Sequence, residues 1–178
     1  MFDPTIYENL KVVMEGAVYD LDLSGEINIV ERSDLIDLAT MSRTYRIGFR
    51  ETKGNGESKG QALAFLQLHA DMEDLAAEIL EQDRASFSAG CRLTLFFETI
   101  VRDISADCRR INEMLTAAWG DRPVILQSLS FDYPSEKEQC YRNRITIDFG
   151  RKIDERQIGD FPRLLEFMRQ SLQSLELT

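Results

Sequence analysis

The sequence is poor in histidine and cysteine, two residue types that often act in catalysis or hold metal ions. Among its 178 residues there is one histidine, His69, and there are three cysteines, Cys91, Cys108 and Cys140. The cysteine count is odd, the spacings are wide and no C-x-x-C pair occurs, so we expect three reduced thiols that pack as small apolar side chains. A zinc site of three cysteines and one histidine has the right count but none of the usual local spacing. We therefore predict no metal, no cofactor and no catalytic residue, which favours a non-enzymatic role.

Membrane and secretion signals are missing as well. No stretch approaches the roughly 18 consecutive apolar residues of a membrane-spanning helix. The N-terminal segment MFDPTIYENLK lacks the basic region and apolar core of a signal peptide. The G-x-S-x-G, H-E-x-x-H and EF-hand patterns are also absent. Together with the reduced cysteines, these absences predict a cytoplasmic protein with no membrane partner.

Basic charge is scarce. The chain has 21 Lys and Arg residues against 31 Asp and Glu residues, and its formal net charge is −10. Because phosphate contacts supply most non-specific affinity for nucleic acid, we predict no nucleic-acid partner. A basic partner or simple solubility is the easier interpretation of this charge. The composition, 43% hydrophobic and 29% charged, is that of an ordinary globular protein, and the length favours a single domain over residues 1–178.

The sequence does contain a series of strand and helix patterns. Helical spacing of apolar residues predicts helices over 58–83, over 104–119 and from about Asp160 to the C-terminus. Residues 32–39 fit either one helical turn or an irregular strand. This order predicts an α+β fold, with a mixed, mostly antiparallel sheet of about five or six strands and three helices packed mainly on one face. Alternating apolar residues predict the strands, over 10–23 (with a bulge near Gly16), 26–31, 41–50, 91–101, 124–133 and 139–149.

A glycine-rich segment, GNGESKG at residues 54–60, lies between a predicted strand and a predicted helix, where phosphate-binding loops occur. The dinucleotide pattern G-x-G-x-x-G fails because Lys59 takes the place of the third glycine. The P-loop pattern fails because Gln61, and not lysine, follows Gly60. Ser58 and Gln61 instead fit an S-x-x-Q capping box. We expect a connector that leads into a capped helix, with an anion site at that helix N-terminus as the alternative.

Basic side chains cluster on two of the predicted strands. Arg46 and Arg50 are an even number of positions apart, as are Arg142 and Arg144, so the members of each pair point to the same side of their strand. In both strands this is the side opposite the apolar face. The ordinary interpretation is the solvated outer face of an antiparallel sheet. The alternative is a site for an acidic ligand or partner, because guanidinium groups bind carboxylate and phosphate in bidentate geometry. The candidate ligand-binding residues are Arg46, Arg50, Lys53, Lys59, Arg142, Arg144, Arg151 and Lys152.

Two functions fit these observations. The first is a non-enzymatic interaction or regulatory protein that self-associates, as a homodimer, or binds another protein. Its support is the absence of catalytic motifs and a polar sheet face with no obvious cover. The second is a binding protein or enzyme for a small phosphate- or carboxylate-bearing ligand, in a cleft near residues 50–60 between the basic strand ends. His69 falls on the apolar stripe of the helix predicted over 58–83, where we expect a packed histidine and not a catalyst.

Overall fold

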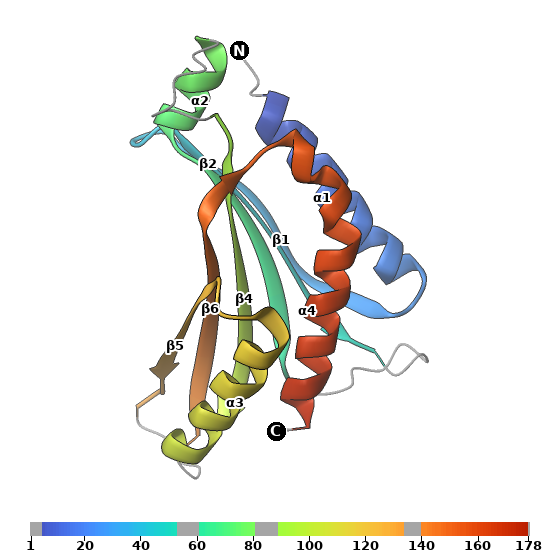
Figure 1. The fold of residues 1–178 in the computed structure, drawn as a ribbon, viewed down its shortest axis with the longest axis vertical. Coiled ribbons are helices and arrows are strands. Elements are labelled where there is room, and N and C mark those ends of the chain that lie inside the picture. Colours follow the sequence, from blue (N-terminus) through green and yellow to red (C-terminus); the bar gives the residue numbers. More distant parts are fainter. Residues whose placement is uncertain (1–4, 53–60, 81–88, 134–139, 178) are drawn as a thin grey trace.

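The computed structural model describes residues 5–52, 61–80, 89–133 and 140–177, and it contains one sheet with helices mainly on one side (Figure 1). The strand order is β1-β2-β3-β4-β6-β5, and every neighbouring pair is antiparallel. The α+β class predicted from the sequence is confirmed, with four helices where three were expected. In chain order the elements are α1 (Thr5–Leu23), β1 (Ile27–Asp37), β2 (Ser42–Glu51), β3 (Leu63–Ala70), α2 (Met72–Ile79), β4 (Cys91–Val101), α3 (Ile104–Trp119), β5 (Val124–Ser130), β6 (Tyr141–Ile153), the short 3-10 helix η1 (Glu155–Asp160) and α4 (Phe161–Glu176).

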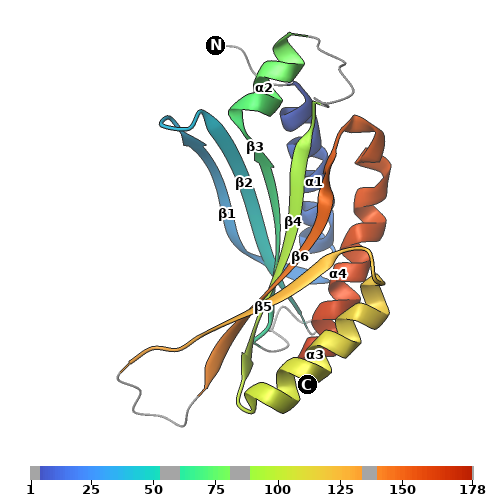
Figure 2. The ribbon, with the colours of Figure 1, turned by 60° about the vertical axis from the view of Figure 1, so that its left-hand side comes forward.

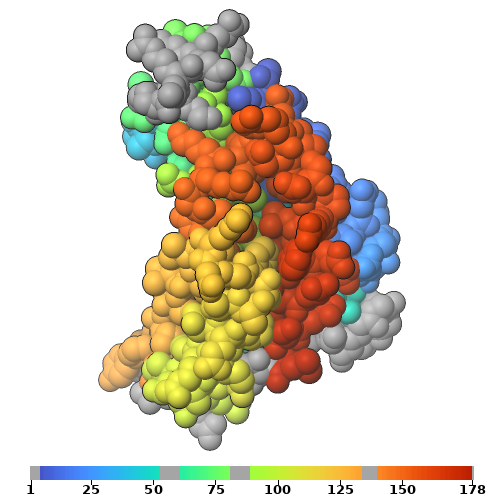
Figure 3. All heavy atoms as spheres, viewed as in Figure 1, coloured from blue at the N-terminus to red at the C-terminus, as the bar shows by residue number. Residues whose placement is uncertain are grey.

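Helices α1, α3 and α4 cover the same face of the sheet (Figure 2). On that face alternate strand residues, such as Ile47, Leu66 and Leu95, are fully buried. The helices contribute stripes of their own, and in α4 the stripe includes Met168 and Leu172. Figure 3 shows this side of the molecule, where α3 and α4 lie next to each other. No helix among the described residues is long and apolar enough to cross a membrane.

The strand predicted over 10–23 is wrong, because this segment belongs to helix α1. Its buried residues are Tyr7, Leu10, Met14 and Val18, which are three or four positions apart, as one face of a helix requires. The alternation read from the sequence had to change phase near Gly16. That change was the sign of a 3.6-residue period and not of a bulge.

The helix predicted over 58–83 is also wrong for most of its length. Residues 63–70 form strand β3, and the helix α2 begins only at Met72. Asp71 caps α2, since its side chain accepts a hydrogen bond from the Asp74 amide at 3.0 Å, while the Asp74 carboxylate accepts one from the Asp71 amide at 3.2 Å. The proposed capping box at Ser58 lies outside the described residues, although Gln61 is just inside them.

The remaining elements follow the sequence closely. The strands expected over 41–50 and 91–101 and the helix over 104–119 agree with β2, β4 and α3. The strands expected over 124–133 and 139–149 pair as an antiparallel hairpin, β5 with β6. Residues 32–37 continue strand β1, which resolves the ambiguity of that segment.

Candidate functional site

The candidate site is the sheet face opposite α1, α3 and α4, called here the uncovered face. Its side chains are those whose parity is opposite to the core, for example Arg46 on β2, Phe65 on β3, Phe96 on β4 and Arg144 on β6. Figure 2 shows α2 near one end of the sheet, and no other described helix lies on this side. Among the described residues, the strand side chains of this face therefore point outward without a helix over them.

One row of side chains crosses all six strands of the uncovered face. The registers place Phe65 opposite Phe96, and Phe65 in turn opposite Gly48. Residues that face each other across antiparallel strands have close Cβ atoms, so they form one continuous line. From edge to edge the line runs Glu31, Gly48, Phe65, Phe96, Thr146 and Leu126.

The two phenylalanines at the centre of this row are buried although no described helix covers them. Phe65 is 3% exposed and Phe96 is 8% exposed. Two guanidinium groups cover them: that of Arg46 lies 4.1 Å from the centroid of the Phe65 ring, and that of Arg144 lies 4.4 Å from the centroid of Phe96. Such a cation–π contact adds about 0.5–1 kcal/mol at exposed sites and more where it is desolvated. The face thus has an aromatic base with a cationic upper layer.

Gly48 makes room for this arrangement. A Cβ at position 48 would lie 2.3 Å from Cδ1 of Phe65, well inside van der Waals contact. The ring of Phe65 therefore lies over the backbone of β2, where Arg46 can cover it. A glycine inside a strand marks such a close approach.

Two carboxylates lie within ion-pair distance of the Arg46 guanidinium. Its Nε is 3.3 Å from Oε1 of Glu31, and one terminal nitrogen is 4.0 Å from Oε1 of Glu98. Glu98 is also the direct cross-strand neighbour of Arg144. A guanidinium has five N–H donors, so donors of Arg46 remain for a further acceptor. The arrangement can bind carboxylate or phosphate groups.

The charge of the uncovered face is opposite to that of the whole chain. On the four inner strands, β2, β3, β4 and β6, the acidic side chains of this face are Glu98 and Asp148, and edge strand β1 adds Glu31 and Asp37. The basic side chains on the same inner strands number six, and they are Arg46, Arg50, Arg92, Arg142, Arg144 and Lys152.

The structure brings some of the predicted site residues together and separates others. Arg46 and Arg144 share the aromatic centre, and Arg50 and Arg142 lie on the same face at one end of it. Lys152 is level with Thr44, six residues from Arg50 along β2 or about 20 Å at the rise of a strand.

The other predicted residues have separate surroundings. Lys152 forms an ion pair with Asp74 of α2. Arg151 lines a hollow of about 90 Å³ with Leu93 and Phe161, next to the start of α4. Lys53 and Lys59 lie outside the described residues. The described chain therefore does not place Arg50 beside Arg151 and Lys152.

Sequence reasoning missed one of the two phenylalanines of the centre, Phe65. Phe65 lies in the range 58–83, where the sequence predicts a helix and the structure has strand β3 before the helix α2 begins. His69 was assigned to the apolar stripe of that predicted helix, yet it lies on the uncovered face of β3, where its Nδ1 is 2.9 Å from Oγ1 of Thr44. The signal that could have found β3 is the alternation of Ala64, Leu66 and Leu68, all of them fully buried.

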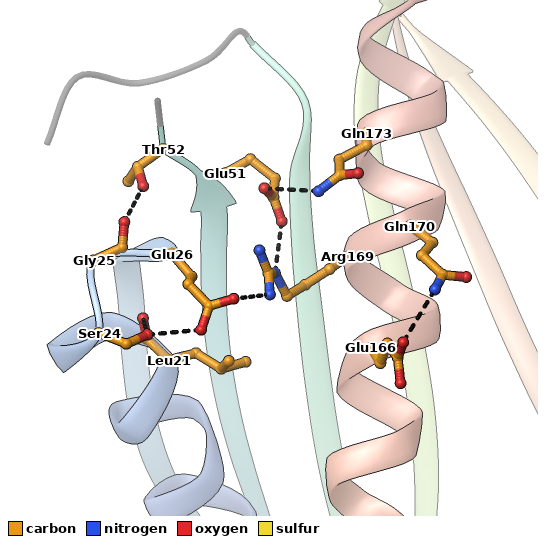
Figure 4. Close-up of polar contacts among 10 residues, drawn as sticks. All are labelled: Leu21, Ser24, Gly25, Glu26, Glu51, Thr52, Glu166, Arg169, Gln170 and Gln173. Atoms are coloured by element: carbon orange, nitrogen blue, oxygen red, sulfur yellow. Dashed lines mark hydrogen bonds and ion pairs between the residues drawn. The ribbon is translucent and has the colours of Figure 1, made fainter. Parts of the chain in front are cut away.

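A second polar cluster, on the covered side, joins α4 to the ends of β1 and β2 (Figure 4). The carboxylate of Glu51, only 5% exposed, accepts hydrogen bonds from Nε of Arg169 at 2.8 Å and from the side-chain amide of Gln173 at 3.1 Å. Arg169 also pairs with Glu26, which accepts a hydrogen bond from Ser24 at 2.9 Å. The hydrogen bonds from Ser24 and from Arg169 lower the pKa of Glu26. The cluster ties three elements together.

The hollow beside this cluster does not suit an anion. It lies between α1 and α4, is open to solvent and has a volume of about 330 Å³. Its charged lining consists of Asp20, Glu26 and Glu166 against Arg169 alone. An excess of carboxylates repels phosphate- and carboxylate-bearing ligands, so among the described residues the uncovered face is the better candidate for acidic groups.

No metal site is found in the part of the chain that the structure describes, where no three His, Cys, Asp or Glu side chains group suitably. The three cysteines are free thiols. Comparison with protein-family models, with curated proteins and with solved structures finds no match to this chain.

Proposed function

We propose that this chain is a non-enzymatic, cytoplasmic interaction module that binds an acidic protein partner through the uncovered face of its sheet. The observation that carries the proposal is the reversal of charge. A chain of net charge −10 places six basic side chains on the inner strands of this one face, against two acidic ones there and two more on edge strand β1. One of the six, Lys152, is paired with Asp74 of α2. Complementary potential of this kind steers a partner and fixes which partner is accepted. The three cysteines are free thiols, the state that the reducing cytoplasm maintains.

The chemistry of the centre supports a protein partner over a small ion. Arginine and aromatic residues are the side chains most enriched at the energetic centres of protein interfaces. Here Arg46 and Arg144 are already held over Phe65 and Phe96, so little side-chain freedom is lost when they bind. The surface is a broad sheet face, whereas small molecules bind in concave pockets. A partner with carboxylates beside apolar side chains would match both layers of the site.

The test uses a synthetic glutamate-rich peptide with interspersed leucines, titrated into the isotope-labelled chain and followed by amide NMR shifts. We expect the largest shifts in β2, β4 and β6, and weaker binding as salt is raised. The variant Arg144→Gln removes a guanidinium that lies 4.4 Å from Phe96. Its matched control is Arg163→Gln in α4, which removes one that lies 5.6 Å from Phe167 on the opposite side of the molecule.

The outcomes separate the two candidate functions. Arg144→Gln should weaken peptide binding about tenfold, at the scale of one lost charge-assisted hydrogen bond, while Arg163→Gln leaves it unchanged. Shifts confined to the helices, or equal losses in both variants, would sink the proposal. A rise in melting temperature with pyrophosphate or citrate but not with the peptide would favour the small anionic ligand, since a ligand that binds only the folded state stabilises it.

A further inference from the structure

The two edges of the sheet differ in how they are protected. Edge strand β1 contains four charged residues, Glu31, Arg32, Asp34 and Asp37, and its pairing with β2 is interrupted by a bulge between Ile29 and Glu31. Charges and bulges are the usual features that keep an edge strand from pairing with another chain. The edge strand β5, with the sequence VILQSLS, has neither charge nor bulge.

The side chains of β5 are exposed although several are apolar. Val124 is 66% exposed and Leu126 is 59% exposed. Figure 2 shows that the far ends of β5 and β6 extend away from the helices. Among the described residues no strand pairs with the outer edge of β5, which is the last strand in the sheet order. An edge of this kind is a template for the addition of another strand.

We propose that β5 pairs with β5 of a second copy of this chain, antiparallel and about a two-fold axis, to give one sheet of two six-stranded halves. A two-fold contact requires a segment that is complementary to itself. Two chains of net charge −10 repel each other, and β5 is a strand that brings no charge into such a contact. An apolar, uncharged strand therefore matches a second copy better than β1 does.

The residues that flank β5 support the same partner. Gln127 is the midpoint of Val124–Ser130, and a register centred on it brings Arg122, two residues before β5, toward Asp132, two residues after β5 of the other copy. Within its own chain Asp132 lies 3.9 Å from Arg142. Arg122 and Asp132 are both exposed. Opposite charges that flank the paired strands attract each other, and the two-fold symmetry makes each such contact occur twice. The strand ends thus carry complementary charge, while the strand itself carries none.

The dimer has a consequence for the uncovered face. Residues opposite each other in antiparallel strands point to the same side of a sheet. The two uncovered faces therefore become one continuous surface, with the helices of both copies on the other side. The pairing itself does not depend on the proposed binding of an acidic partner, because it uses the edge of β5 and not the arginines.

The decisive variant is Leu126→Lys, which places a charge on β5, and its matched control is Leu35→Lys on β1. The two leucines lie on the same face and have nearly the same exposure, 59% and 61%. Sedimentation velocity over a range of concentrations should show a wild-type dimer. Leu126→Lys should raise the dissociation constant at least tenfold, and Leu35→Lys should leave it unchanged. Arg122→Asp should weaken the dimer, and Arg122→Asp with Asp132→Arg should restore it.

Hydrogen exchange on the wild-type chain tests the contact without any variant. The amides of Val124–Ser130 that point to the outer edge should exchange more slowly as the protein concentration rises, while those of Ile27–Asp37 exchange at a constant rate. A chain that is monomeric at about 1 mM, the weak end of specific association, overturns the proposal. A dimer that Leu35→Lys dissociates as strongly as Leu126→Lys, or one without protection in β5, overturns it as well. Loss of peptide binding in Arg144→Gln with an intact dimer would keep the two proposals apart.

Discussion

The guanidinium of Arg46 and the ring of Phe65 lie 4.1 Å apart on a sheet face that no described helix covers. The ring is buried from one side by the backbone of Gly48 and from the other by Arg46. A long side chain with an apolar stem thereby does the work of a covering helix. The contact also links stability to binding, because Arg46, which covers Phe65, is one of the residues that we propose to contact the partner.

Substitution of Gly48 by alanine should destabilise the protein. The new Cβ would lie 2.3 Å from Cδ1 of Phe65, so the ring or the strand must move. Overpacking of this kind costs about 1–3 kcal/mol of unfolding free energy. Urea denaturation followed by circular dichroism measures the change, and the displaced ring should also weaken binding of the glutamate-rich peptide.

Gly16→Ala is the control for this substitution. Gly16 lies inside helix α1 with no atom within 4 Å of an added Cβ. Alanine there should stabilise the protein by about 0.5–1 kcal/mol, the difference between the two residues in a helix. If Gly48→Ala were as stable as wild type, the close approach of Phe65 to β2 would be wrong.

Replacement of Arg169 by methionine should be among the more damaging changes on the covered side. It removes the 2.8 Å hydrogen bond to Glu51, whose side chain is almost fully buried. Breaking one partner of a buried ion pair costs about 3–5 kcal/mol, because the other charge is left uncompensated. The free energy of unfolding, measured in urea, should fall by this amount.

The double variant Arg169→Met with Glu51→Gln identifies the cause. The neutral amide of residue 51 can still bond to Gln173, and no buried charge remains unpaired. The double variant should therefore recover much of the stability lost by Arg169→Met. Equal losses in both would show that Arg169 stabilises the fold through packing alone.

Much of the fold could be predicted from the sequence where one period dominated a segment. The helix α3 shows its caps directly: Asp103 accepts a hydrogen bond from the Ala106 amide, and Gly120 ends the helix with a positive φ of 76°. The segments that failed carry apolar residues on more than one side. In α1 the exposed Val12 and Tyr19 completed a false alternation, because burial and not hydrophobicity defines the face.

The candidate site could be predicted only in part. The parity of Arg46 and Arg144 in their strands predicts that both lie on the outer face. In the structure they do lie on one face, on β2 and β6, with β3 and β4 between them. The burial of Phe65 could not be predicted, because it depends on Gly48 and Arg46 of β2. These two residues are distant from Phe65 in the sequence and come close to it only through strand pairing. Strand order is a long-range property, and a single sequence does not contain it.

Stability should decrease in acid through the carboxylate of Glu8. Partial burial raises its pKa, but hydrogen bonds from Lys11 and Arg43 outweigh burial and hold the pKa below its usual value. A group whose pKa is lower in the folded state adds stability above its unfolded pKa, about 4.3 for glutamate, and loses it as the pH falls through the folded value. Glu8→Gln should therefore lower the unfolding free energy near neutral pH and approach wild type near pH ~3.

The control for this pH dependence is Glu113→Gln on the exposed side of α3. It removes one carboxylate from the chain without touching the contacts of Glu8, so its unfolding free energy should follow that of wild type at each pH. A constant difference between Glu8→Gln and wild type from neutral pH to acid would show that the carboxylate contributes by packing and not by charge.

The cysteines should differ sharply in reactivity toward iodoacetamide. Cys91 is buried, and burial together with the nearby Asp74 and Glu78 carboxylates raises its pKa to about 12. Since the thiolate is the nucleophile, the Cys91 thiol stays protonated and unreactive at pH ~8. Cys140 is exposed and should react first. Mass spectrometry of alkylated peptides over time measures both, and in urea the two rates should converge. If Cys91 of the folded chain reacted as fast as Cys140, the start of β4 would have to unfold locally far more often than the burial of Cys91 allows.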